Sequence, residues 1–231
     1  MNHGLRKHSK YGMSGLYRYS KCPGSVRLAQ AVHRRDTFYS LDGTEAHELL
    51  DYALKNGYWD AEEASKAAGW YERDTREEAG ARIWAVQVCL EYIWDILSAY
   101  DDAVLYVEHP FEFPSFVTDD CWGTCDICIH IPSLDLLYVI DYKHGAGVAV
   151  DIVTKHGPNM QTMGYATGAV EGSGHLQAET IMLAIVQPRA FHKDGPIREL
   201  AVSRQRLREF AVEVDMYIAA CEVENAPLVP S

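Results

Sequence analysis

Hydrophobic residues follow two different periodicities along the chain, and the change falls near residue 100. In the first hundred residues they recur every three or four positions, as on the buried face of an amphipathic helix. A loop up to Leu41 precedes the turn Asp42-Gly43-Thr44, and Gly57 ends the helix that follows. Predicted helices cover 25–34, 44–56, 60–68 and 75–99, and the helix over 60–68 is expected to be short and exposed.

Beyond residue 100 the apolar positions form short runs rich in β-branched and aromatic residues, which is typical of strands. The first three runs, separated by short turns, predict a meander. The predicted strands cover 103–113, 122–131, 136–143 and 179–187, and the predicted helices cover 159–170 and 203–222. This order predicts an α/β fold in which a central mixed β-sheet is flanked by helices.

Length and composition bound the number of domains and the compartment. With 231 residues, 48% of them apolar, the chain is expected to form a single domain over 1–231. It divides into a mainly helical part (1–100), a sheet-containing catalytic core (101–224) and a tail (225–231). No apolar run is long enough to span a membrane and no signal peptide is evident, so we expect a cytoplasmic protein without a membrane partner. The six cysteines are expected to be reduced thiols.

The charge is strongly acidic, with a formal net value of −12. Such a charge argues against broad, non-specific binding to nucleic acid, which depends on neutralising phosphates with Lys and Arg. The distribution is uneven, however. The segment from Arg6 to Arg35 carries eight basic residues and no acid, and Asp36 follows it. This basic arm is therefore the part of the chain best suited to contact phosphates.

Three residues on neighbouring predicted strands could carry chemistry. Asp141 and Lys143 are two positions apart and so share one face of a strand, and Asp126 lies on the preceding strand. Two carboxylates that meet repel each other unless a cation lies between them, and oxygen ligands favour Mg²⁺ or Mn²⁺. A lysine beside that metal can activate water and stabilise the charge of a phosphate.

Four motifs occur in an order that resembles the RecB-like exonuclease branch of the PD-(D/E)XK nuclease superfamily. That branch has the motifs G-T-x-x-H, G-x-x-D, D-x-K and Q-x-x-x-Y. Here they read Gly43-Thr44-Glu45-Ala46-His47, Gly123-Thr124-Cys125-Asp126, Asp141-Tyr142-Lys143 and Gln161-Thr162-Met163-Gly164-Tyr165. The segment Cys22-Pro23-Gly24-Ser25 is also similar to one in phage-encoded members. The resemblance implies a restriction-endonuclease-like core.

The resemblance also implies the roles of the motif residues. The metal ligands would be His47, Asp126, Asp141 and the backbone carbonyl of Tyr142, and Lys143 would be the catalytic lysine, acting with the two aspartates. Glu48 follows His47 and could compete as a ligand or support the ligands through hydrogen bonds.

Two further residues come from the last motif. Gln161 and Tyr165, four residues apart on one helix face, would approach the site and the DNA backbone.

The expected activity is that of an Mg²⁺- or Mn²⁺-dependent DNA exonuclease in phage or bacterial recombination or repair. Its partner would be DNA, and a single-strand annealing recombinase is a further possible partner. The uneven charge suggests a ring-shaped homo-oligomer in which the basic N-terminal arm lines a channel for DNA. Two alternatives keep the same fold: an endonuclease selective for a structure or a sequence, and a catalytically silent DNA-binding module.

A third alternative rests on the spacing of Cys121, Cys125 and Cys128, which matches that of iron–sulfur radical enzymes. On a strand, however, Cys121 and Cys125 would share one face and Cys128 the other. We therefore expect buried thiols and no iron–sulfur cluster. The aromatic residues Trp84, Tyr92 and Trp94 are likewise expected to pack in the core rather than to stack on bases.

Overall fold

A mixed sheet of five strands in the order β1-β2-β3-β6-β7 lies at the centre of the fold. The computed structural model describes residues 9–32, 37–70 and 76–229. The first three strands form the expected antiparallel meander, β6 runs parallel to β3, and β7 is antiparallel to β6. The strands are β1 (Val104–Glu112), β2 (Trp122–Ile131), β3 (Leu136–Tyr142), β6 (Thr180–Val186) and β7 (Ile197–Ser203). The predicted α/β fold with a mixed central sheet is confirmed.

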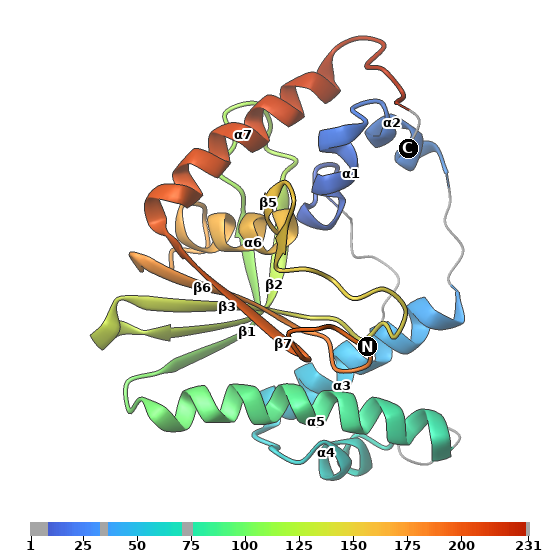
Figure 1. The fold of residues 1–231 in the computed structure, drawn as a ribbon, viewed down its shortest axis with the longest axis vertical. Coiled ribbons are helices and arrows are strands. Elements are labelled where there is room, and N and C mark those ends of the chain that lie inside the picture. The colour runs from blue at the N-terminus through green and yellow to red at the C-terminus, as the bar shows by residue number, and fades with distance from the viewer. Residues whose placement is uncertain (1–8, 33–36, 71–75, 230–231) are drawn as a thin grey trace.

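Helices cover both faces of the sheet (Figure 1). One face packs against α3 (Phe38–Asn56) and α5 (Arg76–Ala99), and α4 (Ala61–Ala67) packs on the outer side of these two helices (Figure 1). The core on this side includes Ile127, Ile129 and Ile131 of β2 and Tyr142 of β3, together with apolar residues of the three helices. Of the helical half that the sequence predicts, α3, α4 and α5 therefore form the layer beneath one face of the sheet.

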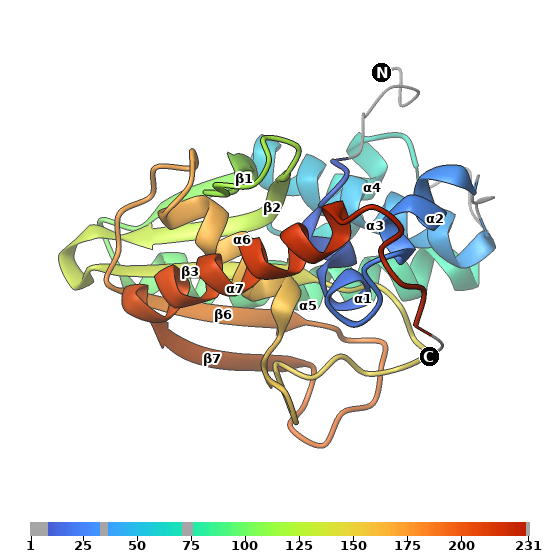
Figure 2. The ribbon, with the colours of Figure 1, turned by 90° about the horizontal axis from the view of Figure 1, so that it is seen from above.

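The opposite face packs against α6 (Met160–Val170) and α7 (Arg204–Glu222), which lie over the sheet in Figure 2. Beside them lie η2 (Met13–Gly15), α1 (Leu16–Lys21) and α2 (Ser25–Ala31). Gly164 of α6 allows the side chain of Met13 to pack directly on the helix, because a Cβ atom there would lie 2.2 Å from Met13 Sδ. This close packing fixes the N-terminal segment over the start of α6.

Two small elements complete the chain. The hairpin of β4 (Val153–Thr154) and β5 (Gly157–Pro158) lies between β3 and α6 in sequence. Residues after α7 dock on the N-terminal segment, where the Gly24 N–H donates to the Pro227 carbonyl at 3.0 Å and Ala226 is buried. The predicted tail is therefore packed against the fold at residues 225–229.

Several predicted boundaries were wrong. Helix α3 begins at Phe38 rather than at Thr44, because Thr37 and Ser40 form a reciprocal capping box six residues earlier. Strand β7 and the segments η2 and α1 had no counterpart in the prediction. Part of α4, expected to be exposed, is buried at Ala61 and Ala64, and Trp84 and Trp94, expected in the core, are 54% and 49% exposed.

Two expectations fall partly outside the described structure. Arg6, Lys7, Arg34 and Arg35 of the basic arm lie outside the described residues, as does the expected end of the first predicted helix (25–34). Within the described ranges, no helix has both the length and the apolar character needed to cross a bilayer.

Candidate active site

The end of β3 presents Asp141 and Lys143 toward α6. Leu137 and Val139, at alternate positions before them, belong to the core on the α6 side, whereas Tyr142 belongs to the opposite core. Asp141 is 2% exposed, and its Oδ2 lies 3.0 Å from Nζ of Lys143. The predicted convergence of a carboxylate and an ammonium is therefore present.

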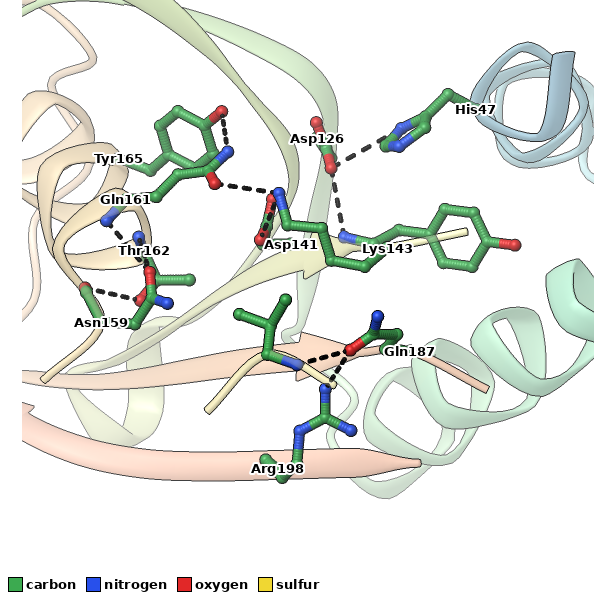
Figure 3. A network of polar contacts seen from close by, with 12 residues as sticks. His47, Asp126, Asp141, Lys143, Asn159, Gln161, Thr162, Tyr165, Gln187 and Arg198 are labelled. Atoms are coloured by element: carbon green, nitrogen blue, oxygen red, sulfur yellow. Dashed lines mark hydrogen bonds and ion pairs between the residues drawn. The ribbon is translucent and has the colours of Figure 1, made fainter. Parts of the chain in front are cut away.

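Asp126 lies beside this pair at an irregular point of β2. The last paired residues of β2 and β3 are Ile127 and Ile140, so Asp126 and Asp141 are the next residues along their strands. The Asp126 Oδ2 accepts a hydrogen bond of 3.1 Å from the Tyr142 N–H (Figure 3). The two carboxylates therefore meet where the pairing between β2 and β3 ends.

The irregularity comes from the neighbouring strand. Pairing between β1 and β2 is regular on either side of Glu108 and Asp126, but these two residues are not paired, and Glu108 has a φ of 52°. A non-glycine residue in this region is strained, and such residues cluster at functional sites. Cys125 and Cys128, three positions apart, consequently lie in the same core, so the strict alternation expected for β2 is broken at Asp126.

His47 approaches the carboxylates from α3, on the other side of Asp126 (Figure 3). Its Nδ1 is 3.7 Å from Asp126 Oδ2, and its ring packs edge-on against the ring of Tyr142 with centroids 5.2 Å apart. Burial lowers the pKa of His47, although the negative charge of Asp141 acts in the opposite direction. A neutral imidazole, the form that binds metal ions, is thus favoured.

The two aspartates are held in an environment that disfavours their charge. Burial raises the pKa of Asp126 to about 6 and that of Asp141 to about 6, against the lowering effect of the Lys143 ammonium. The negative charge of Asp126 also raises the pKa of Asp141. A further cation between the carboxylates would relieve both effects.

The donor set fits a hard divalent cation in its chemistry. It offers two carboxylates, a neutral imidazole and the nearby backbone of Tyr142, and Asp141 Oδ2 is buried without a well-directed hydrogen bond despite its contact with Lys143. Among the described residues, however, no three His, Cys, Asp or Glu side chains are close enough together to hold a metal ion as they stand. Binding would therefore require these side chains to adjust.

Gln161 and Tyr165 connect α6 to the lysine. Nζ of Lys143 donates to Gln161 Oε1 at 2.9 Å, and Gln161 Nε2 donates to the Tyr165 hydroxyl at 2.7 Å. Asn159 caps α6 through hydrogen bonds from the backbone N–H groups of Gln161 and Thr162. The two motif residues are therefore brought into the site, where they position Lys143, while their contact with DNA stays a prediction.

Glu108 is the residue that the motifs missed. It lines a small cavity of about 10 Å³ together with His47, Asp51 and Asp126, and its charge raises the pKa of His47. The signal in the sequence is an acid that directly follows the apolar run Val104–Val107 inside the predicted strand. Glu48, by contrast, is half-buried beside His47 on α3, and its supporting role stays a prediction.

A charged network behind the site joins α3 to three other elements. Asp42 Oδ2 lies 2.6 Å from Arg189 Nη1 and 3.2 Å from His144 Nε2, and Asp42 Oδ1 lies 3.1 Å from Arg82 Nη2. His144 in turn contacts the Tyr142 hydroxyl at 2.9 Å. The network therefore ties the N-terminal part of α3, the helix that carries His47, to the end of β3.

The three clustered cysteines are buried free thiols. All three lie in the core on the α6 side, so the expectation that Cys128 takes the other face was wrong, because the strand is irregular at Asp126. Burial raises the pKa of Cys121 to about 12 and raises that of Cys125, which disfavours the thiolate that binds iron. The expected absence of an iron–sulfur cluster remains a prediction that this environment supports.

Comparison with known protein families matches most of this chain to one family. The model of the DUF2800 family, described as proteins of unknown function, matches residues 8–225. The chain belongs to the DUF2800 family. No curated protein matches it significantly.

Twelve chains of solved structure match this DUF2800 member significantly. One is a protein from Eubacterium rectale that its crystal structure describes as a “putative exonuclease”. The likeness has a TM-score of 0.51 at 12% identity and covers 92% of this chain and 80% of the other. At this identity the likeness shows a shared fold over most of the chain.

Proposed function

We propose that the chain is a metal-dependent DNA exonuclease. The observation that carries the proposal is the meeting of Asp126, Asp141, Lys143 and His47 at one end of β2 and β3, with Gln161 and Tyr165 beside them. These residues come from three separated parts of the chain, and they are those of the four motifs. The fold shared with a protein described as an exonuclease supports the same assignment.

Each residue has a chemical role in this proposal. Asp126, Asp141 and His47 would hold Mg²⁺ or Mn²⁺, which when bound acts as a Lewis acid on the phosphodiester. Lys143 has three N–H donors: one is bonded to Gln161, and a second is taken up by the ion pair with Asp141. The third is available for the attacking water or a phosphate oxygen, and 26% of the lysine side chain remains exposed for that contact.

An endonuclease on the same fold is the second candidate, and a silent DNA-binding module is the third. Both would use the same surface, and only the enzymes need the paired carboxylates. A role in bacterial or phage recombination or repair, in the cytoplasm and with an annealing recombinase as partner, is part of the proposal that follows from the motifs.

One experiment separates these candidates. Linear and covalently closed circular duplex DNA are incubated with the protein and either Mg²⁺ or Mn²⁺. An exonuclease degrades only the linear form, whereas an endonuclease nicks the circle. Asp141→Ala and Lys143→Ala should abolish activity, while Asp119→Ala, an exposed residue in the β1–β2 loop, should not. The absence of cleavage in every metal would overturn the enzyme assignment.

A further inference from the structure

A cavity of about 240 Å³ opens beside the candidate site, and Gln161 is the one motif residue among the described residues that line it. It lies between three segments: the start of α6, the β4–β5 hairpin, and the N-terminal segment of η2 and α1. The residues that matter for its chemistry are Met13, Tyr17, His156, Met160 and Gln161. Ligand pockets typically span roughly 300–1,000 Å³, so this cavity suits a single nucleoside better than a large cofactor.

The cavity is continuous with the catalytic residues through Gln161. This side chain lines the cavity and also accepts the hydrogen bond from Nζ of Lys143 at 2.9 Å. A group bound in the cavity would therefore lie next to the bond that Lys143 and the two aspartates act on. The position is that of a nucleoside attached to the reacting phosphate.

The wall formed by the N-terminal segment has the properties of a nucleic-acid surface. Residues 9–32 contain four basic residues, Lys10, Arg18, Lys21 and Arg27, and no acid, in a chain with a net charge of −12. Across the cavity, His156 lines the wall formed by the hairpin and its neighbour Lys155 is exposed, while Asp151 is the one acid among the lining residues that the structure describes. Phosphates on either side of a bound nucleoside would meet the cations near the cavity, Lys21 beside Tyr17 and Lys155 on the hairpin.

Tyr17 is placed to contact a base. Its neighbours Leu16 and Tyr19 on α1 are fully buried, whereas Tyr17 is 56% exposed at the cavity. The Lys21 ammonium lies 5.9 Å from the centre of its ring. Exposed aromatic rings beside cations are the platforms on which proteins stack bases without reading their sequence.

We propose that this cavity binds the nucleoside adjoining the scissile phosphodiester of a DNA strand, with its base stacked on Tyr17. The proposal rests on the proposed nuclease function and adds to it a binding site for the sugar and base. The basic N-terminal segment supplies the affinity that the acidic remainder of the chain lacks. Binding in this cavity is therefore insensitive to base identity, because every base offers a flat face.

The test compares binding and cleavage of duplex oligonucleotides in wild type and variants. Each duplex carries a fluorophore at its far end, and matched duplexes lack the terminal base at the 3′ or at the 5′ strand end. Affinity is measured by fluorescence anisotropy with Ca²⁺ in place of Mg²⁺, and cleavage is measured with Mg²⁺. Tyr17→Phe retains the ring, and Trp84→Ala removes an equally exposed aromatic residue from α5 as a control.

Tyr17→Ala should weaken binding by about 5- to 100-fold, the range for loss of one stacked base, while Tyr17→Phe and Trp84→Ala bind as wild type does. Removal of the terminal base at one of the two strand ends should weaken binding by wild type by the same factor. It should not weaken binding by Tyr17→Ala any further. If wild type cleaves DNA and Tyr17→Ala binds and cleaves it equally well, this inference alone is overturned. The same holds if the loss of affinity from Tyr17→Ala and the loss from removing the terminal base multiply. A wild type that neither binds nor cleaves DNA would overturn the proposed function with it.

Discussion

The Gln161 amide holds the ammonium of Lys143, with 2.9 Å between Oε1 and Nζ, and is itself fixed by its 2.7 Å hydrogen bond to the Tyr165 hydroxyl. These two bonds make the helix α6 a support for the lysine at the end of β3. The last of the four motifs thus acts, at least in part, on the lysine of the third.

Removing the amide should lower activity without removing the catalytic group. Gln161→Ala is expected to reduce kcat by about 10-fold, as loss of a supporting hydrogen bond does in metal sites, and Lys143→Ala by about 100-fold or more. Because Gln161 acts through Lys143, the double variant should be no slower than Lys143→Ala. Steady-state cleavage of linear DNA gives these values, and Gln205→Ala, an exposed glutamine on α7, serves as control. Multiplicative losses would contradict the coupling.

The buried carboxylates predict a pH-dependent effect of metal on stability. The pKa of Asp141 is raised from 3.8 to about 6, so its contribution to stability is present below pH 4 and lost as the pH rises through 6. The cost above pH 6 is roughly 3 kcal/mol for this residue, at about 1.4 kcal/mol per pKa unit. Mg²⁺ or Mn²⁺ should therefore raise Tm more at pH 8 than at pH 5.

The matched variant for this measurement is Asp141→Asn, which keeps the shape of the side chain and removes its charge. Its Tm without metal at pH 8 should exceed that of wild type, and added metal should no longer raise it. Calorimetry with and without metal provides both values. An equal metal effect at the two pH values would show that these carboxylates do not bind the ion.

Glu108 should contribute to metal affinity or to activity. It lines the small cavity with His47 and Asp126, and it is held in a strained conformation opposite Asp126. Glu108→Gln is expected to weaken Mn²⁺ binding by about 10- to 100-fold, the typical cost of changing a residue that supports metal ligands. Titration calorimetry measures the affinity. Glu112 is an exposed glutamate on the same strand, so Glu112→Gln should bind Mn²⁺ with the affinity of wild type. Wild-type affinity in Glu108→Gln as well would exclude a role of Glu108 in metal binding.

Loss of Asp42 should destabilise the fold. Burial alone would raise the pKa of Asp42, but the hydrogen bond from Arg189 and the nearby charges of His144 and Arg82 lower it overall. The stability from this ionised carboxylate is present above pH 4 and lost as the pH falls through the lowered pKa. Asp42→Asn removes one of the two carboxylates that contact the buried Arg82, leaving Glu45 with its Oε2 2.6 Å from Arg82 Nη2, and should cost about 1.5–3 kcal/mol at pH 7.

Urea unfolding at pH 7 and at pH 3 measures this effect, which should shrink at the lower pH. Asp60 provides a control, since Asp60→Asn retains a side chain that can cap α4. A loss for Asp42→Asn that is the same at both pH values would contradict the electrostatic cause.

The sequence predicted the parts of the site that regular geometry determines. Asp141 and Lys143 share a face because strands alternate, and the short turn after β2 brings Asp126 beside them. The approach of His47 could be inferred only from the motifs, since nothing in the period of α3 shows which side of the sheet it covers. Glu108 was missed because its importance depends on an unpaired position between β1 and β2, which has no signature in composition.

Other errors have equally local causes. Strand β7 follows a loop rich in polar residues and carries Arg198 and Glu199, so its alternation was overlooked, although Arg198 is 2% exposed and bonds to Gln187 Oε1 at 3.1 Å. The N-terminal segment lacks a clear period. Its position follows from long-range contacts, such as that of Met13 with Gly164, which no local pattern encodes.

The N-terminal segment is anchored mainly by residues that follow it by more than a hundred positions. The Tyr11 N–H donates to the Asp120 carbonyl, the Tyr11 hydroxyl to Glu222, and the Gly24 N–H to the Pro227 carbonyl. During synthesis these partners emerge long after the segment itself, so the segment is fully anchored only once residues up to Pro227 have left the ribosome. The wall of the cavity beside Lys143 is therefore assembled only after α7 and the residues that follow it have been made, and a nascent chain shorter than this cannot present a finished site to DNA.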